Sequence, residues 1–162
     1  MAEKTKGTKC FVAVRIRGTV SAHREARETL KQMHLTRNNY AVLIDDRPAF
    51  IGMLRAVQSY ITWGDVSKEC VGMMLHERGR LAGNRKLSEE YLKKAGYKSL
   101  EELAEKIHKC AVMYQKLPGI QPVFRLRPPT KGFKGNIKKS YRARGELGYR
   151  GEDINELVKR MT

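Results

Sequence analysis

The residues in this sequence that are best suited to chemistry lie in one basic segment, residues 125–150. The segment carries nine Lys and Arg residues and a single acid, Glu146, with four glycines and three aromatic residues between the charges. Guanidinium and ammonium groups bind phosphates, and flat rings stack on unpaired bases. The segment therefore predicts a nucleic-acid contact, and RNA is the favoured partner.

We expect the RNA contacts to come from three parts of the chain. The candidates within the basic segment are Arg125, Arg127, Lys131, Phe133, Lys134, Lys138, Lys139, Tyr141, Arg142, Arg144, Tyr149 and Arg150. The rim of the apolar core and a basic link near residues 76–86 supply Arg15, Arg17, Arg47, Arg55, Arg78, Arg80, Arg85 and Lys86. Because the segment has few apolar side chains, we expect it to be mobile in the free protein and ordered on RNA.

Patterns typical of enzymes and metal sites do not occur in this sequence. The four histidines are scattered, and neither HExxH, GxSxG nor a phosphate-binding loop is present. The three cysteines form no CxxC pair. Asp45 and Asp46 precede Pro48, where helix capping explains them better than acid–base catalysis. We therefore predict no enzyme, no cofactor and no metal.

The overall composition agrees with binding to a polyanion. The chain has 162 residues, 33 Lys and Arg against 17 Asp and Glu, and a formal net charge of +16. A charge of this size repels itself and suits a protein that lies against nucleic acid. With 41% hydrophobic residues the chain has enough apolar side chains for a core. No apolar run approaches the ~18 residues of a membrane span, and the cysteine usage fits a reducing cytoplasm.

The pattern of apolar residues predicts which elements position these groups. Alternation predicts strands at residues 10–17, 40–44 and 60–66. Helical spacing predicts one helix after Ser21 and another from Pro48, capped by Ser21 and by the aspartates at 45 and 46. A third helix follows Ser67. The order β-α-β-α-β predicts an α+β fold with a ferredoxin-like, split β-α-β core.

We divide the chain into four parts. Residues 1–9 form a basic tail, residues 10–83 the ferredoxin-like core, residues 84–122 a helical insert and residues 123–162 a basic extension. In the insert, Ser88 begins a short helix, and Ser99 with Glu102 forms a capping box. In the extension, residues 123–127 are a candidate strand, and an amphipathic helix from Ile154 would attach the far end of the basic segment to the body.

Two stretches of the sequence resemble the L thirty family of large-subunit ribosomal proteins. Residues 10–66 contain a leucine-asparagine link before the second strand, an ITWG strand, and an Asp-x-Pro-x-x-x-Gly-Met run formed by Asp46, Pro48, Gly52 and Met53. Residues 123–161 resemble the C-terminal extension of archaeal and eukaryotic members, whereas bacterial members end after the third strand. Residues 84–122 match a helical insert in general character.

The resemblance implies a structural protein of the cytoplasmic ribosome, of the archaeal type, without catalytic activity. Its partners would be large-subunit rRNA, with 5S rRNA nearby, and neighbouring ribosomal proteins, but neither a membrane nor a small-molecule substrate. Three alternatives remain. An RNA chaperone or assembly factor of similar fold shares the charge. An enzyme on this scaffold needs an Arg-Asn or Cys/His cluster, and a DNA-binding protein needs a helix-turn-helix with a basic second helix; neither pattern is found.

Overall fold

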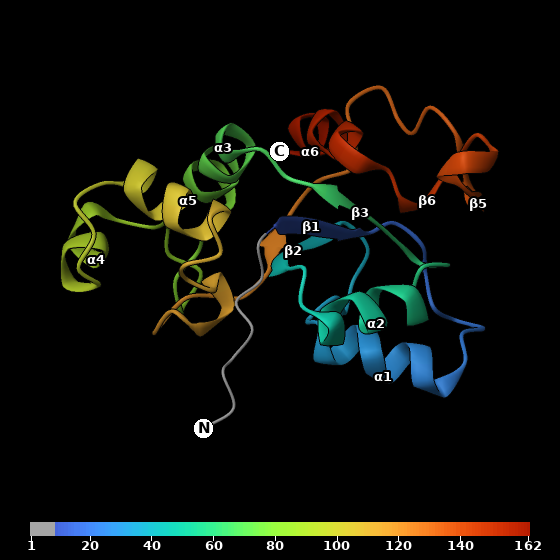
Figure 1. The fold of residues 1–162 in the computed structure, drawn as a ribbon, viewed down its shortest axis with the longest axis horizontal. Helices are drawn as coiled ribbons and strands as arrows, with labels where there is room; N and C mark the ends of the chain where they lie inside the picture. The colour runs from blue at the N-terminus through green and yellow to red at the C-terminus, as the bar shows by residue number, and fades with distance from the viewer. Residues whose placement is uncertain (1–8) are drawn as a thin grey trace.

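The computed structural model describes residues 9–162, so the predicted N-terminal tail, residues 1–9, lies outside the described residues except for Lys9. Within the described residues, six strands form one sheet in the order β4-β2-β1-β3-β6-β5 (Figure 1). Helices lie on both faces of this sheet (Figure 1). No helix between residues 9 and 162 has the length and apolar character needed to cross a membrane.

The centre of the sheet confirms the predicted fold class. β1 (Cys10–Arg15) pairs antiparallel with both β2 (Tyr40–Asp45) and β3 (Ile61–Asp65). β2 and β3 therefore run in the same direction with β1 between them, and α2 (Pro48–Ala56) connects β2 to β3. This is the split β-α-β arrangement of an α+β, ferredoxin-like core. All six residues of β1 are buried, because helices cover both of its faces.

One face of the sheet is covered by α1 (Arg24–Gln32) and α2, whose apolar residues pack against alternate residues of β1, β2 and β3. Both helices exist as predicted, but their predicted caps are wrong. The N-cap of α1 is His23 and that of α2 is Arg47, and neither makes a side-chain cap hydrogen bond. Pro48 at the first position starts α2 by its fixed φ angle.

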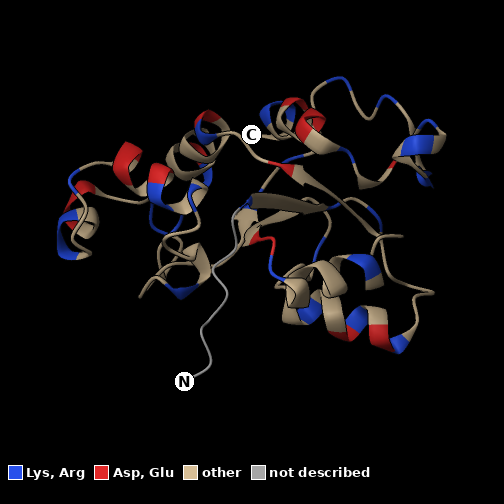
Figure 2. Cartoon of the chain, viewed as in Figure 1, with Lys and Arg blue, Asp and Glu red and all other residues tan. Residues whose placement is uncertain are grey.

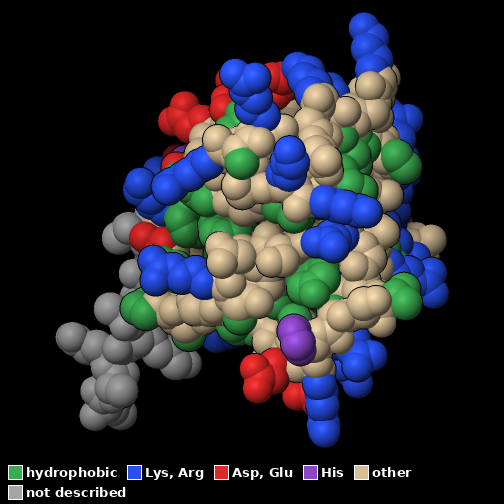
Figure 3. All heavy atoms as spheres, turned by 90° about the vertical axis from the view of Figure 1, so that its right-hand side faces the viewer, with side chains coloured by type: hydrophobic (Ala, Val, Ile, Leu, Met, Phe, Trp, Pro, Cys, Tyr) green, Lys and Arg blue, Asp and Glu red, His purple; other side chains and the backbone are tan. Residues whose placement is uncertain are grey.

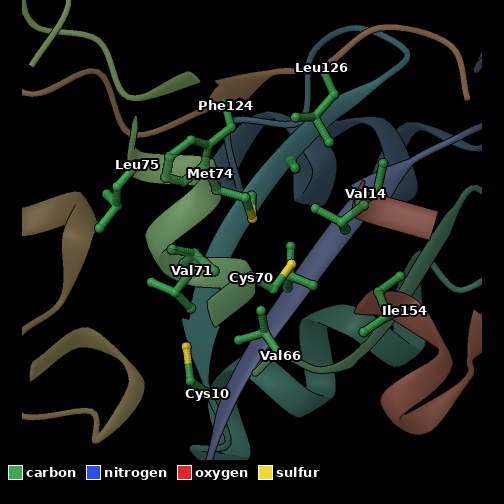
Figure 4. Packing of buried hydrophobic residues seen from close by; sticks show 14 of the residues in the cluster. Cys10, Val14, Val66, Cys70, Val71, Met74, Leu75, Phe124, Leu126 and Ile154 are labelled. Carbon is green, nitrogen blue, oxygen red and sulfur yellow. The ribbon is translucent and has the colours of Figure 1, made fainter. Parts of the chain in front are cut away.

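The opposite face is covered by α3 (Lys68–Arg78), α5 (Leu100–His108) and α6 (Ile154–Met161). Cys70 and Met74 of α3 face the sheet and belong to the same apolar cluster as Val14 of β1 (Figure 4). Residues of the predicted insert and of the predicted extension thus share one apolar cluster with the core strands. All three cysteines are free thiols.

Three predicted serine caps are confirmed. Ser67 accepts a hydrogen bond from the Cys70 amide at 3.2 Å and begins α3. Ser88 caps α4 (Glu89–Lys94), and Ser99 caps α5. The capping box differs in one detail from its usual form, because Glu102 accepts from the amide of Lys98, one residue before the cap.

The extension supplies the strands at both edges of the sheet. β4 (Phe124–Arg125), two residues of the expected strand, pairs with β2. β6 (Gly145–Tyr149) pairs parallel with β3, and β5 (Asn136–Ser140) lies outside it. Short 3-10 helices lie at Tyr114–Lys116, Tyr141–Ala143 and Gly151–Asp153. The basic segment therefore holds an irregular stretch at residues 126–135, followed by the parallel strands β5 and β6, which the 3-10 helix at Tyr141–Ala143 connects.

Candidate nucleic-acid interface

A buried ion pair fixes the extension to the core. Arg150 Nη2 and Glu146 Oε2 are 2.6 Å apart, and each side chain is 5% exposed. Arg150 Nε also donates to Thr62 Oγ1 on β3 at 2.8 Å. The second carboxylate oxygen of Glu146 accepts from the Gly135 amide at 2.7 Å. The pair thus ties β6 to β3 and to the chain that leads into β5, and Arg150 lies inside the protein, away from the exposed basic surface.

Arg15 is a second buried arginine among the predicted contacts. Its side chain donates to the carbonyl oxygen of Leu35 at 3.0 Å and to Thr19 Oγ1 at 2.8 Å. Burial lowers the pKa of this guanidinium from its ordinary value. These bonds join the end of β1 to the loops on either side of α1. Arg15 and Arg150 therefore act within the fold, and we leave both out of the proposed RNA contacts.

Three further predicted contacts have partners within the protein and are partly exposed. Arg47 forms an ion pair with the buried Asp45 at 2.8 Å and lies 5.0 Å from the centre of the Phe50 ring. Arg78 donates to the carbonyl oxygen of Thr162 at 2.7 Å. Arg80 donates to the carbonyl oxygen of Gly79 at 2.9 Å. Each guanidinium has hydrogen-bonding capacity left over, but its position is set by the fold.

The remaining cations divide between the two ends of the molecule. Arg85 and Lys86 are exposed in the link between α3 and α4, at the start of the insert, while β5 lies at the opposite end of the molecule (Figure 1). Lys and Arg residues also lie on β5, on the turn after it and on the loop that leads to it (Figure 2). The structure therefore separates the predicted contacts into more than one surface.

The surface around β5 holds four exposed cations within seven residues of the chain. We define the β5 basic surface as the exposed side chains Lys138, Lys139, Arg142 and Arg144. Within residues 9–162 none of these four side chains forms an ion pair with an acid. By contrast, Lys134 pairs with Glu156 at 2.7 Å. Unpaired cations have no internal partner to give up when a phosphate approaches, so this surface is suited to a polyanion.

The aromatic residues of the segment differ in accessibility. Phe133 is partly buried and packs against the core, so it is not free to stack on a base. The Tyr141 hydroxyl donates to Asp153 at 2.6 Å, and Arg150 lies 4.8 Å from the centre of the Tyr141 ring. Tyr149 is 44% exposed, and its hydroxyl donates to Asp65 at 2.9 Å.

The protonation of these two tyrosines follows from their surroundings. The hydrogen bond to Asp153 raises the pKa of Tyr141, and partial burial together with the bond to Asp65 raises the pKa of Tyr149. Both phenols therefore stay neutral hydrogen-bond donors around neutral pH. Among residues 9–162, no group of three or more His, Cys, Asp or Glu side chains is arranged to hold a metal ion.

Comparison with known proteins identifies relatives along nearly the whole chain. Residues 11–61 match the family model described as ribosomal protein L30p/L7e. The chain is similar to the large ribosomal subunit protein uL30 of Thermofilum pendens, with 48% identity covering 93% of this chain and 97% of the relative. The protein of the same name from Archaeoglobus fulgidus is 47% identical, over 93% of this chain and 99% of its own length. That from Ignicoccus hospitalis is 49% identical, over 94% and 98%. The similarity therefore includes the insert and the extension as well as the core.

Proposed function

Since the chain belongs to the ribosomal protein L30p/L7e family, we propose that it is a structural constituent of the large ribosomal subunit that binds and stabilises folded large-subunit rRNA. The observation that carries the proposal is the identity of 47–49% along almost the full length of archaeal large-subunit proteins. The same observation does not favour a separate RNA chaperone or assembly factor. The protein acts by binding, and we assign it no reaction.

The physical basis of the proposed role is countercharge. Ribosomal RNA folds against the repulsion of its own phosphates, and a compact protein with a net charge of +16 supplies fixed positive charge where RNA helices converge. Each phosphate that a Lys or Arg side chain neutralises releases condensed counterions, so binding weakens as salt rises. Arginine binds phosphate bidentately, while lysine acts as a point charge.

We propose that the contacts come from the exposed cations. The proposed set is Arg55, Arg85, Lys86, Arg125, Arg127, Lys131, Lys134, Lys138, Lys139, Arg142 and Arg144, with the partly exposed Arg17, Arg47, Arg78 and Arg80 at its margin. Their exposure and the absence of acid partners for the β5 basic surface support this choice. From the family resemblance we extend the proposal to a position near 5S rRNA and to contacts with neighbouring ribosomal proteins.

The double variant Arg142→Ala/Arg144→Ala is expected to weaken binding to a large-subunit rRNA transcript. The slope of log K against log salt should fall by about one for each phosphate contact removed. The measurement is filter binding across a range of salt concentrations. A matched control is Lys93→Ala/Lys94→Ala in α4, which removes the same charge at the far end of the molecule (Figure 1).

The control separates a local contact from net charge. Both double variants lower the formal charge of +16 by two. We expect the α4 variant to keep nearly the wild-type slope. Equal losses in the two variants would show that net charge alone attracts the RNA, and the β5 basic surface would then not be a contact.

A further inference from the structure

A cleft of about 430 Å³ opens beside the β5 basic surface, between α2 and the strands β3 and β6. Aromatic side chains and two arginines line it, namely Phe11, Trp63, Tyr141, Tyr149, Arg55 and Arg142. Its volume is within the range of sites that bind small organic groups. Figure 3 faces this end of the molecule and shows apolar side chains lying between Lys and Arg side chains.

The cleft exists because the helices on this face stop at β3. The apolar cluster beneath α1 and α2 contains residues of β1, β2 and β3 but none of β5 or β6. The strand order nevertheless continues the sheet outward from β3 to β6 and β5. Trp63 of β3 and Tyr149 of β6 lie where the helical cover ends, so their side chains are at the boundary between the core and solvent. Trp63 is 9% exposed, and Tyr149 is 44% exposed.

The Tyr149 ring is held in place from several directions. Its centre lies 6.2 Å from that of Trp63 and 6.4 Å from that of Phe11, which approaches edge-on. The hydrogen bond from its hydroxyl to Asp65 fixes the far end of the ring. A ring that is already ordered loses little conformational entropy when another flat group stacks on it.

The charge around the cleft identifies the occupant. Arg55 on α2 and Arg142 in the turn after β5 are both exposed. No acidic side chain lines the cleft, and the two nearby carboxylates, Asp65 and Asp153, are engaged by the hydroxyls of Tyr149 and Tyr141. A flat group with negative charge beside it satisfies both the rings and the arginines. That combination is the chemistry of a nucleotide, with a base that stacks and phosphates that bind guanidinium groups.

We propose that this cleft binds an unstacked base of RNA, with Tyr149 as the stacking platform and Arg55 and Arg142 on the adjoining phosphates. The inference rests on the proposed function, since it assumes that the protein binds rRNA through this end. It adds a specific requirement, namely that a single-stranded or bulged nucleotide lies at the β5 basic surface. RNA-binding proteins commonly read such extruded bases by stacking.

The position of Trp63 makes the proposal directly measurable, because it is the chain's one tryptophan and it lines the cleft. We would titrate the whole protein with a mixed-sequence single-stranded RNA pentanucleotide and with a large-subunit rRNA transcript, following Trp63 emission. Both RNAs should change the emission, and a fully paired RNA duplex long enough to stay annealed should not. Tyr149→Ala should bind the pentanucleotide about tenfold more weakly, the loss expected for one stacked base, while Tyr149→Phe, which keeps the ring, should bind nearly as well as wild type.

Arg55→Ala tests the cleft without changing the packing of the sheet, because this side chain is exposed on α2. It should also weaken pentanucleotide binding, whereas the control Arg37→Ala, an exposed arginine outside the cleft, should not. The cleft proposal would be overturned if the transcript bound without changing Trp63 emission and if Tyr149→Ala and Arg55→Ala bound it with wild-type affinity. The proposed function would still stand in that case. Failure of the wild-type protein to bind the transcript would overturn the proposed function itself.

Discussion

Replacing Arg150 with methionine is expected to lower the free energy of unfolding by about 3–5 kcal/mol, the usual cost of removing one partner from a buried ion pair. The variant leaves the Glu146 carboxylate, only 5% exposed, without its cation. It also removes the hydrogen bond to Thr62 that joins β6 to β3. Urea unfolding followed by far-ultraviolet circular dichroism measures the change. Folded domains are stable by only about 5–15 kcal/mol in total, so the effect is large.

An exposed ion pair from the same extension provides the control. Lys134 and Glu156 are 2.7 Å apart, but their side chains are 70% and 65% exposed. Lys134→Met should therefore change stability by less than about 1 kcal/mol. The double variant Glu146→Leu/Arg150→Met should recover part of the loss, because it leaves no unpaired buried charge. If Arg150→Met cost no more than Lys134→Met, the extension would not be anchored as described.

Gly64→Ala is expected to destabilise the protein by about 1–3 kcal/mol or more, the cost of overpacking a closely packed site. Gly64 lies in β3, where a Cβ atom would overlap the carbonyl oxygen of Gly151 and come within 3.0 Å of Ile154 Cβ. Backbone and a buried side chain are the obstacles, so little can yield. The strand and the start of α6 would have to separate, and thermal unfolding should show a lower midpoint.

The matched substitution Gly52→Ala should have the opposite sign. Gly52 lies within α2, and a Cβ atom there would meet nothing within 4 Å. Alanine in a helix interior is more favourable than glycine by roughly 0.5–1 kcal/mol. A neutral Gly64→Ala would contradict the close contact between β3 and the chain entering α6, and with it the docking of the extension on the core.

The sequence was most informative where local pattern and local structure coincide. Alternation identified the three core strands, and the serines at 67, 88 and 99 marked helix starts correctly, because capping is decided within three residues. The predicted cap at Asp45 was wrong for a tertiary reason. Asp45 is the last residue of β2, paired with Cys10, and its carboxylate is engaged by Arg47. These contacts, rather than the sequence of the turn, fix the chain before α2.

The strands β5 and β6 could not be predicted from periodicity. β6 contains two glycines and a glutamate, and it is a strand because it pairs with β3, more than 80 residues earlier, and with β5. Context of this kind outweighs β-propensity. The same pairing buries Arg150, which the sequence presents as one basic residue among nine. Glu146 was the one signal in the sequence for this burial, because a single acid in a basic segment suggests a specific ion pair within the protein.

The aromatic cleft was missed for a related reason. Trp63 lies in a strand that the sequence predicted and that the structure confirms, while Tyr149 was a candidate contact because of its basic neighbours. Nothing in the sequence brings residues 63 and 149 together, because their proximity depends on the pairing of β3 with β6. Exposure is also a property of the fold, so the accessible arginines could be separated from the buried ones only once the elements were placed.

The central claim is that this protein is a resident component of the large ribosomal subunit. The most direct test is to sediment a lysate of the source organism through sucrose gradients at low and at high salt and to quantify the protein in each fraction by mass spectrometry. We predict one copy per large subunit at both salt concentrations. Sedimentation apart from the large subunit, or loss from it at modest salt, would contradict the claim and indicate a transient RNA-binding factor.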